Sequence, residues 1–292
     1  MKKVIIDFDN TMGVPGCDVD DGLALLYLLG NPELCRVEAA CTAYGNSTID
    51  IVHDNTLRLF ELWELDIPVY RGGEGPGDME SEASRFLSQA AAGSPGELSI
   101  LATGSTTNLL GALRADPAFL DNTAEVVLMG GVTESLVING RYMSELNFSC
   151  DPDATLAVLQ AASEGAKVSV ATAQHCLPSF FDRKMMEDGF GANSWLVNTI
   201  NYWFGDMDER YRSTGFVAWD LVAAAMLIKP WLFEGETRDV SLNRQLISAG
   251  FLESTTHDAP QARIETPVIS NPAALVEDAL ESWQRGLDLL GI

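Results

Sequence analysis

Short apolar runs of strand character alternate along the chain with longer segments in which apolar residues recur at helical spacing. The runs that predict strands are residues 4–8, 37–44, 67–72, 98–104, 124–131 and 166–173. An apolar helical segment follows the first run and should end at Gly30-Asn31-Pro32, and a helical segment also follows each of the others. Strands that alternate with helices in this way predict βαβ units, a mainly parallel sheet and helices on both of its faces.

The second half of the chain adds three features to this pattern. An aromatic segment at 193–211 and an apolar one at 217–228 predict helices, and residues 271–290 predict an amphipathic C-terminal helix. Residues 233–270 lack helical period and predict a small antiparallel edge to the sheet. Because no repeat or low-complexity linker divides the chain, we predict a single α/β domain over residues 1–292 with an open, mainly parallel sheet.

Composition narrows the classes of partner. The net charge of −24 argues against nucleic acid and anionic membranes, and it disfavours a highly charged anionic substrate unless a metal inverts the local field. The five cysteines have no metal-ligand spacing, and the N-terminus reads as a strand rather than a signal peptide. We therefore expect a cytoplasmic protein with reduced cysteines and a small-molecule ligand. The sequence is also compatible with a homo-oligomer.

The stretch between the first predicted strand and its helix carries five aspartates: Asp7, Asp9, Asp18, Asp20 and Asp21. Carboxylates brought together raise one another's pKa values unless a cation lies between them. Oxygen ligands of this kind suit Ca²⁺ or Mg²⁺. The alternative is that Asp18 and Asp20 only cap the helix and interact with its dipole.

Further polar or small residues fall where other predicted strands end. Gly45-Asn46, Thr103-Gly104 and Met129-Gly130-Gly131 follow three of the apolar runs. Ligands of open α/β sheets bind at the carboxyl ends of the strands. The pattern therefore predicts a polar site assembled from several strand ends.

One interpretation of the opening stretch is a phosphatase of the haloacid dehalogenase type, with Asp7 as nucleophile and Asp9 as acid and base on Mg²⁺. That chemistry also requires a lysine to neutralise the phosphate and a late acidic pair after a strand. The chain has only five lysines, and no such pair follows an apolar run. One motif supports this alternative and the others are absent.

More of the chain resembles the nucleoside hydrolase family, the inosine-uridine-preferring N-ribohydrolases. Asp7-Phe8-Asp9 and Asp20-Asp21 match its paired acidic motifs, although residues 10–19 between them are longer than the common pattern. The later matches, in order, are AYGNST, LATGSTTNLLGAL, VVLMGG, ELNFSCDPDAT and AWDLVAAAMLIKPWLF. The resemblance runs from residue 3 to about residue 233 and implies Ca²⁺-dependent hydrolysis of the N-glycosidic bond of ribonucleosides.

The resemblance also implies roles for individual residues. The metal ligands would be Asp9, Asp21, the carbonyl of Thr103, and Asp220. Asp9 would be the general base on the attacking water, and Asp7 would orient other groups. Ribose would be bound by Asp20, Asn46, Glu145 and Asn147, with Met129 against the sugar. A Ca²⁺-dependent ribose-binding protein without catalysis is a third possibility, disfavoured because every inferred position holds a competent side chain.

The sequence departs from the commonest family pattern at the residue that would protonate the departing base. Many members place a His before the last metal aspartate as the acid, whereas this chain has Trp219. Trp-Asp here resembles the purine-preferring branch, in which stacking on the base replaces an acid. Trp203 is the candidate for a second aromatic wall, and His175, which follows a strand end, is a weaker candidate for the pocket. Core packing is the alternative role for both tryptophans.

Overall fold

The computed structural model describes residues 1–254 and 261–292. Its centre is an eight-stranded sheet with the strand order β12-β13-β8-β5-β4-β1-β2-β3, in which all neighbours are parallel except β12 and β13. The strands are β1 (Lys2–Phe8), β2 (Cys35–Thr42), β3 (Val69–Tyr70), β4 (Leu98–Ala102), β5 (Glu125–Met129), β8 (Val168–Ala171), β12 (Thr237–Ser241) and β13 (Gln261–Glu265). The predicted fold class is thereby confirmed.

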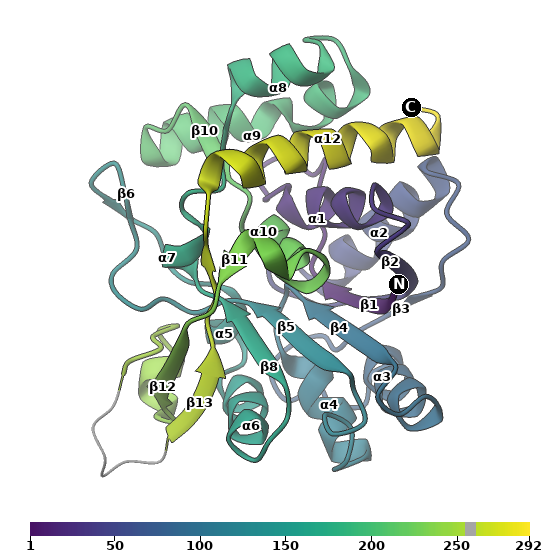
Figure 1. Cartoon of the computed structure of the whole chain (residues 1–292), viewed down its shortest axis with the longest axis vertical. Coiled ribbons are helices and arrows are strands. Elements are labelled where there is room, and N and C mark those ends of the chain that lie inside the picture. Colours follow the sequence, from purple (N-terminus) through teal and green to yellow (C-terminus); the bar gives the residue numbers. More distant parts are fainter. Residues whose placement is uncertain (255–260) are drawn as a thin grey trace.

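Helices cover both faces of this sheet (Figure 1). The longer ones are α1 (Asp20–Leu29), α2 (Ile49–Leu62), α3 (Glu82–Gly93), α4 (Thr107–Ala115), α6 (Pro152–Ser163), α8 (Arg183–Phe190), α9 (Trp195–Tyr211), α10 (Trp219–Ile228) and α12 (Pro272–Leu290). Helices α1, α2, α10 and α12 lie on one face, and α3, α4 and α6 lie on the other. No helix in the described ranges is both long and apolar enough to cross a bilayer.

Each face has its own hydrophobic cluster, and the central strands contribute to both. In β1, Val4, Ile6 and Phe8 belong to one cluster, and Ile5 belongs to the other. A strand buried on both sides reads as a continuous apolar run, which is the pattern the sequence shows. On the α1 face, every residue of α10 is buried, as a helix that is apolar all round requires.

The strand order reverses next to β1. From β1 the chain proceeds to β2 and β3 at one edge, then returns to β4 beside β1 and continues through β5 and β8 toward the other edge. Where connections leave a parallel sheet in opposite directions, the carboxyl ends of the strands leave a crevice. The crevice here lies beyond β1, β4 and β5.

Short elements complete the chain: β6 (Val137–Ile138), β7 (Arg141–Tyr142), α5 (Asn147–Cys150), α7 (Ala173–Cys176), β9 (Phe180–Asp182), β10 (Gly215–Val217), the 3₁₀ turn at Pro230–Leu232, β11 (Phe233–Glu234), α11 (Arg244–Ile247) and β14 (Val268–Ile269). The predicted antiparallel edge at 233–270 is present as the pairs β12–β13 and β11–β14, although residues 255–260 lie outside the described residues. The pairs β6–β7 and β9–β10 were not predicted, because strands of two or three residues carry no periodic signal.

A buried ion pair joins three of the helices on the α1 face. Lys229, 5% exposed, follows α10 and donates to Asp278 of α12 over 2.6 Å, and the Tyr27 hydroxyl of α1 donates to the same carboxylate over 2.7 Å. We expect Lys229→Ala to lower the free energy of unfolding by about 2 kcal/mol, because it leaves a partly buried carboxylate without its cation. Urea unfolding measures this.

The control is Lys184→Ala, which removes the exposed i,i+4 ion pair with Asp188. Exposed pairs of this kind contribute little, so this variant should unfold at the same urea concentration as the native protein. Equal effects of the two substitutions would contradict the structural role of Lys229.

Candidate active site

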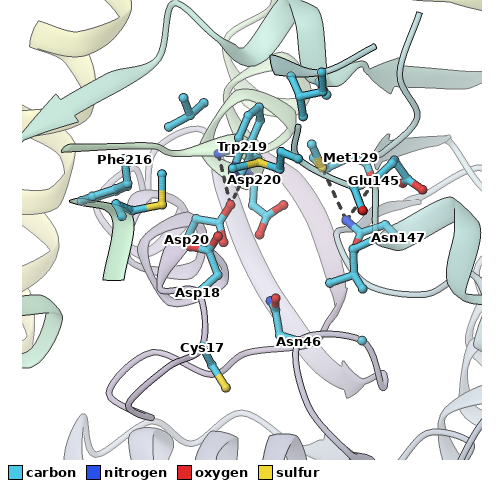
Figure 2. A pocket seen from close by; sticks show the side chains of 18 of the residues that line it. Cys17, Asp18, Asp20, Asn46, Met129, Glu145, Asn147, Phe216, Trp219 and Asp220 are labelled. Carbon is cyan, nitrogen blue, oxygen red and sulfur yellow. Dashed lines mark hydrogen bonds between the residues drawn. The ribbon is translucent and has the colours of Figure 1, made fainter. Parts of the chain in front are cut away.

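A cavity of about 320 Å³ opens at the crevice beyond β1, β4 and β5. Figure 2 shows its side chains: Cys17, Asp18 and Asp20 come from one segment, and Met129, Glu145 and Asn147 lie across the cavity from them. The residues predicted from sequence that line it are Asp20, Asn46, Thr103, Met129, Glu145, Asn147, Trp203, Trp219 and Asp220. Nine predicted positions from seven separate segments of the chain therefore meet in one cavity.

Asp9 and Asp21 lie beneath the cavity rather than in its wall, with exposed fractions of 0% and 1%. The Asn46 backbone N–H donates to Asp9 Oδ2 over 2.5 Å, and its side-chain amide donates to Asp9 Oδ1 over 3.2 Å and to Asp21 Oδ2 over 3.3 Å. A Cβ on Gly45 would lie 2.0 Å from Asp9 Oδ2. The Gly-Asn pair after β2 is thus explained: the glycine gives Asp9 room, and the asparagine binds both carboxylates.

Three carboxylates in this region lie close enough together to hold a metal ion. Asp20, Asp21 and Asp220 each present an oxygen, and these oxygens lie within 4.8 Å of one another. Asp20 Oδ2 also accepts hydrogen bonds from the backbone N–H groups of Trp219 and Asp220, over 3.1 and 3.3 Å. The donors are hard oxygens at the N-termini of α1 and α10, so the residues fit a hard divalent cation.

We call the four buried carboxylates Asp9, Asp20, Asp21 and Asp220 the floor of the cavity. The electrostatics of this floor also favour a cation. Burial raises the pKa of Asp9 to about 6, and burial followed by repulsion from neighbouring aspartates raises the pKa of Asp21 and of Asp220 well above the ordinary value. Among the described residues, no salt bridge reaches Asp9, Asp20, Asp21 or Asp220. A bound divalent cation would supply the missing positive charge.

The β5 side of the cavity is held by Asn147 and Glu145. The Asn147 amide donates to the carbonyls of Thr103 and Met129 over 2.8 and 3.1 Å. The Glu145 carboxylate accepts from the backbone N–H groups of Gly131, Phe148 and Ser149 over 3.1, 2.7 and 2.9 Å. Glu145 therefore secures the backbone around the cavity in addition to lining it, a role that the sequence did not indicate.

The opposite wall is aromatic and apolar. Trp219 begins α10, and Trp203 lies in the middle of α9, with Leu136, Met143 and Phe216 beside them. Trp203 is 5% exposed, and its indole nitrogen Nε1 has no hydrogen-bond partner among the described residues. Both tryptophans line the cavity while largely buried, so the two roles considered from the sequence, core packing and pocket wall, are combined.

The long loop at residues 10–19 forms a further part of the wall. It is fixed to α9 at two points, where the Tyr202 hydroxyl donates to the Cys17 carbonyl over 3.2 Å and Arg210 donates to the Gly16 carbonyl over 2.9 Å. Asp18 does not cap α1, whose N-cap is Val19 without a side-chain hydrogen bond. Instead, the Asp18 carboxyl lines the cavity and accepts a hydrogen bond from the backbone N–H of Val19 over 2.6 Å.

Helix α9 is also held at its C-terminal end. Asn139, in the β6–β7 turn, donates to the carbonyls of Tyr211 and Arg212, and Arg141 donates to those of Glu209 and Arg210. These are the carbonyls that a helix end leaves without internal partners. The hairpin and the 10–19 loop thus fix the helix that carries Trp203.

His175 lies outside the cavity. It belongs to α7, is half-buried, and its ring faces the backbone of Thr266 and Pro267 rather than the carboxylates. Burial lowers its pKa. The strand end that precedes α7 lies at the site, but the turn of α7 directs this side chain toward the β12–β14 region.

Asp7 is separated from the cavity as well. Its Oδ1 accepts a hydrogen bond from the Asn108 amide over 2.8 Å, and burial raises its pKa to about 7. The same amide also donates to the Thr42 carbonyl over 3.0 Å, so Asn108 joins Asp7 to the end of β2. Among the described residues no lysine lines the cavity. The phosphatase alternative therefore has neither an accessible nucleophile nor a phosphate-neutralising lysine.

Fold and site together define an α/β protein with an acidic, metal-competent pocket at the switch point of its sheet. The sequence model of the inosine-uridine preferring nucleoside hydrolases matches residues 4–268. The chain therefore belongs to the nucleoside hydrolase family, whose members are hydrolases of small ribonucleosides. The family predicted from the sequence is confirmed.

Similar proteins are named for different bases. A probable uridine nucleosidase of Arabidopsis thaliana is 28% identical over 265 residues, 80% of this chain and 79% of the relative. The pyrimidine-specific ribonucleoside hydrolase RihB of Escherichia coli is 24% identical over 78% of this chain and 79% of its own. The structure of a purine-preferring ribonucleoside hydrolase from Gardnerella vaginalis has a TM-score of 0.82 at 20% identity, covering 98% and 99% of the two chains.

The raised pKa values predict how stability depends on pH without metal. In the folded protein the pKa is about 6 for Asp9 and about 7 for Asp7, against 3.8 ordinarily. The folded state therefore binds more protons than the unfolded chain between these values, and stability falls as the pH rises through them. In a chelator, we expect Tm to fall by roughly 5 °C or more from about pH 5 to about pH 7.5.

Scanning calorimetry in chelator and in excess Ca²⁺ tests this expectation. The cation should remove the part of the decrease that comes from Asp9, because it stabilises that ionised carboxylate, and should leave the part that comes from Asp7, whose pKa is raised chiefly by burial. Parallel Tm profiles in the two conditions would mean that the floor does not bind the ion.

Proposed function

We propose that this protein hydrolyses the N-glycosidic bond of ribonucleosides in a Ca²⁺-dependent reaction that releases free base and ribose. The observation that carries the proposal is the juxtaposition, in one cavity, of the acidic floor with the Trp203–Trp219 wall. The floor suits a ribose diol and a cation, and the wall suits a planar base.

Asp9, Asp21, Asp220 and the carbonyl of Thr103 would hold the ion, with Asp20 close enough to contribute. When bound, Ca²⁺ supplies a fixed positive charge that orients the ribose hydroxyls and makes a neighbouring water more acidic. The choice of Ca²⁺ rests on the all-oxygen donor set and on the family resemblance. The floor's oxygens also suit Mg²⁺, so the metal is to be tested directly.

Asp9 is proposed as the general base. Without an ion, burial raises its pKa to about 6, and a bound cation would lower that pKa, so the carboxylate is ionised at neutral pH and can accept a proton. Asn46 holds both of its oxygens, so its orientation is fixed before substrate arrives. Asp9 would take one proton from the water that attacks C1′.

Ribose would be bound by Asp20, Asn46, Asn147 and Glu145, with Met129 against the sugar. As the glycosidic bond breaks, positive charge develops on C1′ and the ring oxygen. Carboxylates fixed around the sugar stabilise that charge more than they stabilise the neutral nucleoside, which lowers the barrier.

The base would stack on Trp219, with Trp203 as the second wall. The residues that line the cavity, all in the described part of the chain, include no histidine or lysine. Stacking that disperses charge on a ring protonated from solvent therefore replaces an acid side chain. This supports a preference for purine nucleosides, whose larger ring uses more of the aromatic wall. We further propose that the protein acts in the cytoplasm, which its free cysteines support.

The roles of the first two aspartates can be separated by isosteric substitution. Asp9→Asn should lower kcat for ribose release roughly 10²- to 10⁴-fold, because the base is lost. Asp7→Asn should cost at most roughly 10- to 100-fold, because Asp7 only supports other groups through Asn108. A larger loss from Asp7→Asn than from Asp9→Asn would reverse these assignments.

Trp219→Ala tests the aromatic wall. Stacking on a base contributes roughly 1–3 kcal/mol, so kcat/KM for inosine should fall about 10- to 100-fold. A nitrophenyl riboside should lose much less, because its leaving group needs no protonation. Equal losses on both substrates would mean that Trp219 is structural.

Reducing-sugar release from a panel of purine and pyrimidine nucleosides, with and without a calcium chelator, tests the proposal as a whole. Chelator-sensitive release that Ca²⁺ restores is the expected result, and the panel measures the purine preference. Phosphate release from nitrophenyl phosphate without any ribose release would overturn the proposal.

A further inference from the structure

A second cavity adjoins the aromatic wall of the first. Its volume is about 490 Å³, which lies in the range of small-molecule binding sites. Met207, Val217 and Trp219 line both cavities, so these three side chains form the partition between them. All are at most 9% exposed. A ligand in the second cavity would therefore contact side chains that belong to the proposed base wall.

The rest of this second cavity is mostly apolar. Val137 and Ile138 of β6 line it, together with Leu177, which follows α7, and Phe180, which begins β9. In Figure 1 the hairpin that contains β6 projects from the side of the fold next to α7. The cavity between these segments suits a ligand with an apolar or aromatic body.

One cation lines this cavity. Arg212 follows α9, and its side chain makes no salt bridge within the described part of the chain. Its neighbours Arg141 and Arg210 differ, because both donate to backbone carbonyls. Carboxylates are abundant in a chain with a net charge of −24. A guanidinium that none of them engages is available to an anion from outside the chain.

The backbone of Arg212 also indicates a role for its side chain. Its φ is 52°, in the left-handed region, at the position after a helix where glycine is usual. An arginine there carries a cost in backbone free energy, which the hydrogen bond from Asn139 to its carbonyl helps to offset. Strain of this kind concentrates at sites where the side chain has a function.

We propose that the second cavity binds a small amphipathic organic anion, with an apolar or aromatic body and one carboxylate, and that the bound anion strengthens nucleoside binding in the first cavity. The body would lie against the apolar lining. The carboxylate would pair with Arg212, with Thr214 beside it. The binding site is independent of the proposed function, whereas the effect on nucleosides rests on it.

The effect on nucleosides follows from the shared partition. Met207 and Trp219 can move toward the second cavity while space remains there, and such movement weakens stacking on a base. Met207 is the more adaptable of the two, because its side chain is unbranched. A bound body would restrict this movement and hold the wall in place before the base arrives, which makes nucleoside binding more favourable.

Calorimetric titration of the whole protein with 2-naphthoate tests the site, and 2-naphthamide serves as a neutral probe of the same shape. Arg212→Gln should weaken the affinity for 2-naphthoate about tenfold, because it removes the opposite charge, and should leave the affinity for 2-naphthamide unchanged. The matched control is Arg58→Gln. Arg58 is an exposed residue of α2 that lines neither cavity, so this variant should bind both probes as the native protein does.

Leu177→Trp tests where the probes bind. Leu177 lines only the second cavity, and the larger side chain should fill that space and weaken both affinities at least about tenfold. Ile138→Trp fills the cavity from the hairpin side and serves if Leu177→Trp does not fold. Unchanged affinities would overturn the proposal. Competitive inhibition of inosine hydrolysis that persists in these variants would also overturn it, because the probe would then occupy the first cavity.

The effect on nucleosides is measured as KM for inosine with and without 2-naphthoate at a concentration that saturates the native protein. KM should fall about fivefold in the native protein and should not change in Leu177→Trp. Binding of 2-naphthoate without a fall in KM would overturn the coupling between the cavities.

The outcomes separate this inference from the proposed function. Ribose release from nucleosides without binding of either probe would overturn the inference alone. Absence of ribose release from every nucleoside would overturn the proposed function and the coupling, and calorimetry, which needs no turnover, would still decide whether the second cavity binds the anion.

Discussion

The burial of several carboxylates at one edge of the sheet is the constraint on which the rest of the site depends. Asp9, Asp20, Asp21 and Asp220 are all at most 3% exposed, and removing such groups from water is costly. The protein offsets this cost with the N-termini of α1 and α10, the Asn46 amide and the Thr103 hydroxyl. The remaining negative charge suits a bound cation, as the proposed function requires.

The fold provides this arrangement because the two helices whose first turns carry the aspartates, α1 and α10, are largely buried. Apart from Asp220 in its first turn, helix α10 is apolar, and it packs with α1 beneath α12, so both helix N-termini point into the same crevice. The strand order reverses there, which leaves room beyond β1, β4 and β5. Core packing and site geometry therefore have one origin.

Sequence predicted the parts of this structure that have a periodic or local signal. The apolar runs located the central strands, and the aspartates and the Gly-Asn pair located the floor. Three features could not be predicted for a common physical reason, since each depends on contacts between distant segments. They are the backbone hydrogen bonds of Glu145, the docking of the 10–19 loop on Tyr202, and the clamp of the β6–β7 turn on α9. The position of His175 outside the cavity depends on the direction of one short turn, α7.

Floor and aromatic wall are built from different kinds of structure. The floor consists of strand ends and buried helix N-termini, whereas Trp203 is presented by a helix that a surface hairpin and a surface loop hold in place. Substitutions or length changes in those surface segments can reshape the wall while the floor keeps its geometry. The similar proteins are named for uridine, pyrimidine and purine nucleosides, and these two surface segments are the place to look for matching differences in sequence.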